Sequence, residues 1–381
     1  MAIDKITTAS ITDANITTAK LAYDASPFRN IIINGSMDLA QRATSSTGIT
    51  SDGYYTVDRF LTEMGSFGTW TQSQYADAPS GQGFNNSLKM DCTTANGSLA
   101  ANVIALVGQS IEGQMLQAIK QGTANAQSTT LSFWHKHTKT GTNIVELLDA
   151  DNANAVSGAY TQSVSNTWEK ATITFPANTS GTYGNDNARS LRIRFIMGAG
   201  SNYTSGTLAT TWQTSITDAN RYVGQVNNAD STSNNFIITG VQYEVATVAS
   251  EFEFLPVDVN LARCLRYYQK SYSYATAPGT NTVVGIITTD GSAGGLTTGY
   301  LTGNIKFEKI MRAAPTLTFY EKGGDSGVCS RLQAGVARTD NQPIATESIS
   351  DNNASIYSSG TANANSIDVH FEATAELWLI Q

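Results

Sequence analysis

The chain has little charge, few histidines and few cysteines for its 381 residues. Charged side chains make up 14% of it, against about 25% in an average soluble protein. The 31 acidic and 23 basic residues give a net charge of −8, and no basic cluster is present, so nucleic-acid binding is not expected. The three cysteines form no CxxC pair, which disfavours a zinc site and a disulfide framework.

Long apolar runs are also missing. No run of about 18 apolar residues occurs, so membrane insertion is not expected. The first residues lack the apolar centre of a secretion signal, which predicts synthesis in a reducing cytoplasm. Thr, Ser, Asn and Gly take the place of charge, and 34 aromatic residues (16 Tyr, 13 Phe, 5 Trp) argue against disorder. This composition favours extended β structure over helix.

A five-residue spacing marks the first 25 residues. Its apolar positions are Ile6, Ile11, Ile16 and Leu21. Five matches neither the 3.6-residue period of a helix nor the 2.0-residue period of a strand. One chain cannot bury one apolar residue in five, whereas several chains around a shared axis can. We therefore predict a short trimeric stalk over residues 1–26; the alternative is a disordered tail that contains four aliphatic residues.

Residues 27–258 have the pattern of one large β unit. The strand around Leu191 alternates, with Leu191, Ile193 and Phe195 on one face and Arg192 and Arg194 on the other. Short strands separated by Gly- and Asn-rich turns predict a sandwich of the jelly-roll type. The expected strands are 31–33, 131–134, 170–175, 191–195 and 236–238.

Two helices and a second β unit complete the prediction. Helical spacing of apolar residues predicts helices at about 110–120 and at 258–271. The second helix links the sandwich to a smaller C-terminal β domain, which we place at 259–381. The fold class is therefore mainly β: a short trimeric N-terminal stalk, a β-jelly-roll sandwich and a smaller C-terminal β domain. In the last domain, strands are expected at 283–288, 305–307, 317–320 and 367–380.

Few residues suggest catalysis or metal binding. His135 and His137 share a strand face, but a third ligand is missing, so we interpret them as exposed strand histidines. Ser110 lies in a near match to the nucleophile elbow of hydrolases, with Glu112 at a glycine position. We interpret Ser110 instead as the N-cap of the first helix.

Two pairs of acidic residues are also candidates for metal binding or catalysis. Asp149 and Asp151 are candidate calcium ligands or a carboxylate pair, although a solvated turn explains them as well. No other cofactor is expected. Glu251 and Glu253 share a strand face, and we expect them to flank buried phenylalanines at 252 and 254.

Aromatic residues in predicted loops are the candidates for stacking on a sugar. We expect Trp134 and Trp168 in the core. The candidate glycan-binding residues are Tyr54, Tyr55, Trp70, Tyr203, Trp212 and Tyr222, with Tyr75 as a further loop aromatic. For each of them, packing against the protein is the alternative.

Several short motifs follow one another in a familiar order. They are Asn34-Gly35, Gln41-Arg42, Gly53-Tyr54, Asp58-Arg59-Phe60, 131–134, 241–244 with 252–253, 263–269, 311–316 and 373–377. In these motifs and in their order along the sequence, the chain resembles tail-fibre or receptor-binding proteins of bacteriophages. Phe60 departs from the family pattern, which usually has Trp there. The stalk is also short, which suggests a compact fibre or spike.

The resemblance implies a function. It implies a non-enzymatic virion protein, synthesised in the bacterial cytoplasm and assembled as a homotrimer. Residues 1–26 would contact other virion proteins, and the C-terminal domain would contact host polysaccharide or lipopolysaccharide. One alternative is a capsid head fibre or decoration protein without receptor binding. Another is a polysaccharide depolymerase, which would need a carboxylate pair in a groove.

Overall fold

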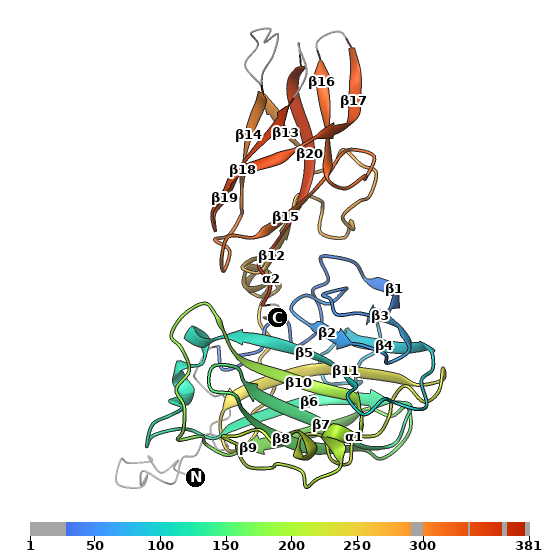
Figure 1. Cartoon of the computed structure of the whole chain (residues 1–381), viewed down its shortest axis with the longest axis vertical. Helices are drawn as coiled ribbons and strands as arrows, with labels where there is room; N and C mark the ends of the chain where they lie inside the picture. Colours follow the sequence, from blue (N-terminus) through green and yellow to red (C-terminus); the bar gives the residue numbers. More distant parts are fainter. Residues whose placement is uncertain (1–27, 291–299, 334–335, 360–363, 378–381) are drawn as a thin grey trace, which may run out of the picture.

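Antiparallel β-sheets make up most of the structure, a computed structural model that describes residues 28–290, 300–333, 336–359 and 364–377. Figure 1 shows a broad sandwich below and a narrower β unit above, with α2 and β12 between them. The predicted mainly-β fold class is therefore confirmed. The predicted stalk positions Ile6, Ile11, Ile16 and Leu21 lie outside the described residues.

The sandwich consists of two antiparallel sheets whose neighbouring strands are mostly not consecutive in the chain, as in sandwiches with Greek-key connections. The six-stranded sheet has the order β1 (Ser45–Ile49), β3 (Thr69–Tyr75), β4 (Ser87–Thr94), β11 (Asn235–Val245), β6 (Thr129–His137) and β9 (Glu169–Phe175). The five-stranded sheet has the order β2 (Leu61–Met64), β5 (Ile104–Glu112), β10 (Arg189–Ala199), β7 (Gly141–Asp149) and β8 (Asn154–Gln162).

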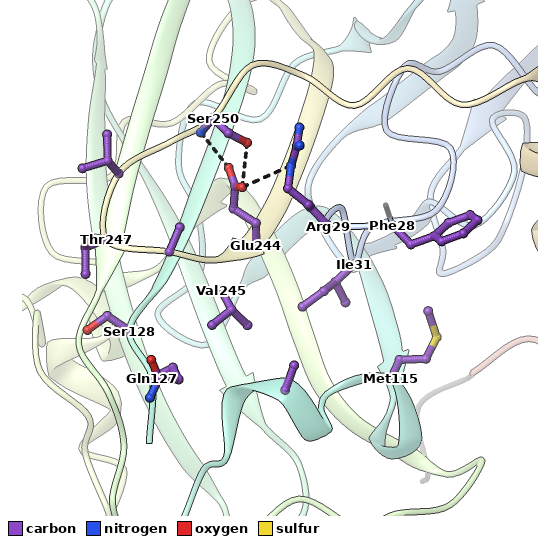
Figure 2. A pocket seen from close by; sticks show the side chains of 13 residues that line it. Phe28, Arg29, Ile31, Met115, Gln127, Ser128, Glu244, Val245, Thr247 and Ser250 are labelled. Carbon is purple, nitrogen blue, oxygen red and sulfur yellow. Dashed lines mark hydrogen bonds and ion pairs between the residues drawn. The ribbon is translucent and has the colours of Figure 1, made fainter. Parts of the chain in front are cut away.

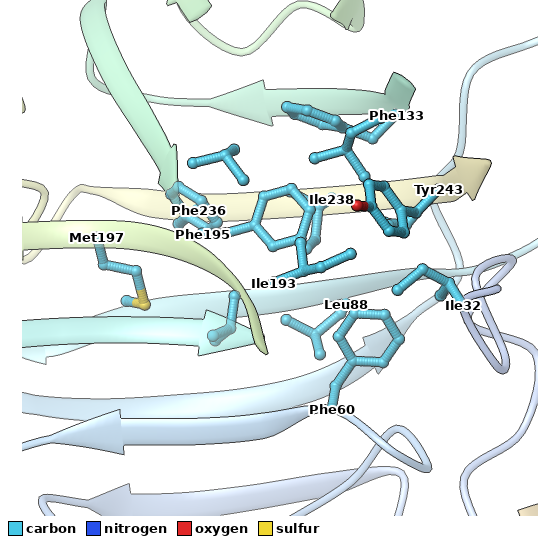
Figure 3. Packing of buried hydrophobic residues seen from close by; sticks show 14 of the residues in the cluster. Ile32, Phe60, Leu88, Phe133, Ile193, Phe195, Met197, Phe236, Ile238 and Tyr243 are labelled. Carbon is cyan, nitrogen blue, oxygen red and sulfur yellow. The ribbon is translucent and has the colours of Figure 1, made fainter. Parts of the chain in front are cut away.

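The core of the sandwich lies between these two sheets. Strand β10 contributes Ile193 and Phe195, and the opposite sheet contributes Phe133 and Phe236 (Figure 3). The Phe133 and Phe195 rings meet edge to face, with centroids 5.0 Å apart, a favoured geometry for aromatic pairs. The predicted alternation along β10 is correct, but its second face is buried as well.

Two predicted elements of the sandwich are wrong. Residues 31–33 are buried but form a bend rather than a strand, although Ile31 N donates to Tyr243 O at 2.9 Å. The predicted helix at 110–120 is the end of β5, because Ile111 and Glu112 pair with Leu191 and Arg189 of β10. Pairing with β10 overrides the apolar spacing, and only two short 3-10 turns follow, η3 (Gly113–Met115) and η4 (Gln117–Ile119).

The upper unit follows the linking helix, which is present but shorter than predicted. Helix α2 (Val257–Leu265) ends before β12 (Tyr268–Lys270), which pairs with β20. One sheet contains β12, β13 (Ile287–Asp290), β15 (Thr316–Tyr320), β16 (Val328–Gln333), β17 (Val336–Pro343) and β20 (Ala364–Thr374). The other contains β14 (Tyr300–Lys306), β18 (Ala345–Ile349) and β19 (Asn353–Ser359). A separate hydrophobic cluster fills this unit; the domain boundaries given above stay predictions.

The joint between the two units contains a buried carboxylate held by two arginines. Glu376 forms ion pairs with Arg59 and, at 3.3 Å, with Arg42. Each guanidinium also stacks on a tyrosine that follows α2: Arg59 lies 3.4 Å from the Tyr267 ring centroid and Arg42 lies 3.8 Å from that of Tyr268. Cation–π contacts gain strength when they are desolvated, so this cluster fixes the end of β20 to the sandwich.

A second carboxylate supports the same joint from β5. Glu112 accepts hydrogen bonds from Arg266 Nε at 2.8 Å and from the Tyr267 hydroxyl. Burial by itself would raise the pKa of Glu112, but these donors outweigh it and lower the pKa. Arg312 donates to the Ala375 carbonyl at 2.8 Å. Many of the motifs that carry the family resemblance therefore meet at the joint.

The Asn34-Gly35 motif closes a tight contact within the sandwich. Val241 N donates to Gly35 O at 2.9 Å, and a Cβ at position 35 would overlap the Val241 carbonyl oxygen. We expect Gly35→Ala to lower the free energy of unfolding by about 1–3 kcal/mol, the usual cost of overpacking. Gly65→Ala, which adds a methyl group in open space, is the control. Equal denaturation midpoints for the two variants would contradict the prediction.

Candidate functional site

A buried ion network crosses the outer face of the five-stranded sheet. Glu63 of β2 pairs with Arg192 of β10 and lies 3.6 Å from Arg194 on the same strand. Arg194 also pairs with Glu146 of β7 at 2.8 Å, and Glu146 pairs with Arg221 at 2.7 Å. The two arginines on the second face of β10 are thus buried and partnered across three strands.

Glu146 is the centre of this network. Besides the two arginines, the Tyr222 hydroxyl donates to it at 3.0 Å. Burial would raise the pKa of Glu146, but the charges and hydrogen bonds of Arg194 and Arg221 outweigh burial and lower the pKa. Burial and the neighbouring charge of Arg194 lower the pKa of Arg192. Glu146 is therefore ionised at neutral pH and is held in place by its two arginines and by Tyr222.

A long connection covers one half of this face. It contains α1 (Ser201–Thr204) and η5 (Asp218–Asn220). Tyr222, at its end, packs on Leu106, Ile144 and Ile196 of the sheet. Ser157 N of β8 donates to Ala209 O at 2.8 Å and fastens the connection to the far strand. The other half of the face, around Glu63, is left uncovered by this connection.

An open groove of about 630 Å³ lies beside the uncovered half. It is lined by Thr50, Ser51, Asp52, Glu63, Met64, Gly65, Ile104 and Arg194. Within the part of the chain that the structure describes, the buried Arg194 Nε has no hydrogen-bond partner. The groove thus offers two carboxylates and one guanidinium next to an apolar side chain, Ile104. These groups can bond hydroxyls and pack against carbon, as small-ligand sites do.

Three of the six aromatic residues predicted to bind a glycan are too buried for a sugar to stack on them. Tyr54, Trp70 and Tyr222 are at least nine-tenths buried. Trp70 lies within β3 rather than in a loop, and its Nε1 donates to Phe67 O at 2.8 Å. Tyr54 contributes to the joint, because its hydroxyl donates to Leu377 O. In this conformation none of the three can offer a ring face to a ligand.

The other three are partly exposed but are not brought together. Tyr55 supports one wall of the groove, because its hydroxyl donates to Ser51 O at 2.8 Å. Tyr203 packs near Tyr222 with ring centroids 5.8 Å apart. Trp212 donates to Pro176 O at 2.8 Å, at another part of the sandwich. None of the six lines the groove.

Other aromatic predictions also need correction. Trp134 and Trp168 are only partly buried, and Trp168 Nε1 donates to Asp77 at 3.2 Å. Tyr75 ends β3 and is exposed. Phe254, expected to be buried, is exposed beside Phe252, because the chain from 251 to 256 is not a strand.

Asp149 and Asp151 organise a turn at the end of β7. Both Asp149 oxygens accept bonds from N–H groups, including Asp151 N at 3.0 Å and Gln121 Nε2 at 2.6 Å. Asp151 accepts a bond from Gly184 N at 2.9 Å. Among the described residues, no group of three or more His, Cys, Asp or Glu side chains could hold a metal ion.

His135 and His137 face the core rather than solvent, which corrects our interpretation. His135 Nδ1 lies 2.8 Å from Gln162 Oε1, and His137 Nε2 lies 3.0 Å from the Tyr160 hydroxyl. Burial lowers the pKa of both imidazoles. Ser110 is a buried residue of β5, not a helix cap.

The sequence does not reveal the groove, because its residues are far apart in the chain. One signal was available: the pair Arg192 and Arg194 on alternate positions of a strand requires acidic partners if that face is covered.

In the described ranges, no helix is both long and apolar enough to cross a membrane.

Comparisons with known proteins give distant likenesses. No protein-family model and no curated protein matches the chain. The enzymatically active domain of tailspike protein 4 of bacteriophage CBA120 is 17% identical, with a TM-score of 0.29, over 58% of this chain and 22% of that one. The carbohydrate-binding module TmCBM61, solved with β-1,4-galactotriose, is 10% identical, with a TM-score of 0.29, over 57% and 99%. The N-terminal cellulose-binding domain of Cellulomonas fimi β-1,4-glucanase C is 15% identical, with a TM-score of 0.23, over 43% and 80%. TM-scores this low assign neither a family nor a ligand to this chain.

Proposed function

We propose that the chain is a non-catalytic attachment protein, a trimeric fibre or spike of a phage-type virion that binds host-surface glycans in the groove beside the five-stranded sheet. The observation that carries the proposal is the juxtaposition of Asp52, Glu63 and Arg194 in an open groove. The sequence resemblance to phage tail fibres supports the virion assignment. The N-terminal segment would contact other virion proteins.

The groove suits a neutral or mixed-charge saccharide. Carboxylates accept hydrogen bonds from sugar hydroxyls, and the Arg194 guanidinium donates to ring or glycosidic oxygens. Ile104, which is partly exposed at the start of β5, can cover the carbon face of a pyranose. Because the ion network holds Glu63 and Arg194 in place, binding does not require these side chains to be ordered first.

Trimer formation would raise the affinity of a weak site. Three linked grooves on one particle increase avidity by about 10²–10⁴-fold when their geometry allows simultaneous binding. The C-terminal unit, which the sequence suggested as the contacting tip, would then project beyond the grooves and hold its own orientation through the joint.

A glycine in the groove permits a direct test. Gly65 lines the groove, and a side chain there would enter open space. We expect Gly65→Trp to weaken binding by at least about tenfold, because the indole occupies the ligand volume. Gly97→Trp, also in open space and outside the groove lining, is the matched control. Binding is measured by biolayer interferometry against a panel of purified bacterial capsular polysaccharides and lipopolysaccharides.

Each outcome has a separate meaning. Loss of binding in the Gly65 variant alone supports the groove. Equal binding by both variants would show that the glycan binds elsewhere on the protein. If the unaltered trimer binds no member of the panel and no susceptible cells, the attachment function is rejected in favour of a structural virion role. A fall in polysaccharide viscosity during incubation would contradict the non-catalytic assignment.

A further inference from the structure

A pocket lined by both apolar and polar side chains lies where the described chain begins. Its volume is about 560 Å³, and it lies between the segment 28–31, the 3-10 turns and the stretch 244–250 that follows β11. Figure 2 shows Ile31, Met115 and Val245 around the pocket, with Phe28 at one side. The ion pair of Arg29 and Glu244, at 3.9 Å, stands at its edge.

Two large apolar side chains at this pocket are exposed. Phe28 is 61% exposed and Val248 is 65% exposed. Phe28 also has a φ of 62°, which is rare for a bulky residue and costs free energy. Glu253 holds this backbone in place, because its two carboxylate oxygens accept bonds from Phe28 N at 2.6 Å and Asn30 N at 2.8 Å. The fold thus fixes an aromatic ring outside the core.

The length of the preceding chain limits how far this pocket can lie from a stalk axis. Leu21, the last position of the five-residue repeat, is seven residues before Phe28. Seven extended residues span at most about 25 Å. A unit of the sandwich's size has a radius of gyration of roughly 17 Å and is therefore roughly 45 Å wide. In such an assembly Phe28 lies within about 25 Å of the shared axis, so the surface around Phe28 is the part of each sandwich nearest the axis.

We infer that a neighbouring copy of this chain covers this pocket in the oligomer, with the exposed rings and methyl groups of residues 28 and 248 at the contact. The inference rests on the trimeric part of the proposed function. In a cyclic trimer each contact is head to tail, so one face of the pocket region meets a different face of the next copy. Exposed apolar side chains beside polar groups and an Arg–Glu pair match the usual composition of such interfaces.

A charge at position 248 tests the contact. We expect Val248→Asp to raise the dissociation constant of the trimer by at least about tenfold, because a carboxylate would be buried at the interface. Val164→Asp is the matched control, since Val164 is 58% exposed and lies on another loop. Mass photometry across a dilution series measures the trimer fraction of the full chain, and circular dichroism checks that both variants remain folded.

Cross-linking distinguishes a neighbouring copy from the chain's own N-terminal segment. The three native cysteines are buried, so a single cysteine introduced as Val248→Cys reports on its own surroundings. A maleimide–benzophenone reagent attached to this cysteine, which cross-links on illumination to whatever side chain lies against it, should join two chains in this variant and none in Val164→Cys. A monomeric full chain overturns the inference. So does a trimer that is unaffected by Val248→Asp and yields no cross-linked pair. Groove binding, measured separately, does not depend on either result.

Discussion

Replacing Glu376 with alanine is expected to lower the free energy of unfolding by about 3–5 kcal/mol, the usual cost of removing one partner from a buried ion pair. The reason lies in Arg59, which is 1% exposed. Without Glu376 its guanidinium would stay buried, and its remaining partners among the described residues would be the Ser110 carbonyl, at 2.8 Å, and the Tyr267 ring. Arg42, which shares the carboxylate, would lose an ion pair at the same time.

Urea denaturation measures this loss, and two further variants make it specific. Asp218→Asn breaks an ion pair with Arg221 whose acidic side chain is 61% exposed, and it should cost less than about 1 kcal/mol. The double variant Arg59→Met with Glu376→Leu leaves no unpaired charge at position 59 and should recover the part of the loss that comes from Arg59, while Arg42 still lacks its partner. A Glu376→Ala midpoint equal to that of Asp218→Asn would show that the joint does not depend on this carboxylate.

Replacing Glu146 with glutamine is expected to cost about 3 kcal/mol at pH 7 and to flatten the acid side of the stability profile. The pKa of Glu146 is lowered below its ordinary value of 4.5 by Arg194 and Arg221, against the effect of burial. The unfolded chain therefore binds this proton at a higher pH than the folded chain does. The stability that Glu146 contributes is complete above about pH 4.5 and is lost as the pH falls through the lower, folded value.

The measurement is the unfolding free energy of both proteins between pH 7 and pH 3. Wild type and Glu146→Gln should differ most at neutral pH and should converge in acid. Glu169→Gln serves as a comparison, because Glu169 also has a lowered pKa but accepts its bonds from backbone N–H groups of an exposed turn. Parallel curves for wild type and Glu146→Gln would contradict an ionised Glu146 in the folded state.

The strands of the sandwich could be predicted because their pattern is local. Leu191, Ile193 and Phe195 alternate with polar residues, and only one arrangement buries all three on the same face. The helix predicted over 110–120 failed for the opposite reason. Glu112 is the last residue of β5 and is held there by residues far away in the chain: Arg189 lies opposite it on β10, and Arg266, after α2, donates a hydrogen bond to it. No short-range sequence pattern contains these partners.

The groove could not be predicted, since its residues come from three strands and a loop. The aromatic prediction also shows a limit of composition. Trp70 and Tyr222 occur in polar surroundings in the sequence, but in the fold each covers apolar side chains and finds a partner for its polar atom. A tyrosine or tryptophan can thus fill a core while it satisfies one hydrogen bond. Its neighbours in sequence do not reveal which role it has.

The way in which β12 and the end of β20 join the two units has a mechanical consequence. The chain enters the upper unit through Tyr268 and leaves it through Thr374, which lies opposite Tyr268 in the register of the two strands. Beyond that pair, Glu376 and Leu377 are fastened to Arg59 and Tyr54 of the sandwich. A unit attached by one flexible segment can swivel, but one attached at two points resists torque about its long axis. The upper unit therefore turns with the sandwich, and a twist applied at its far end is transmitted to the whole body.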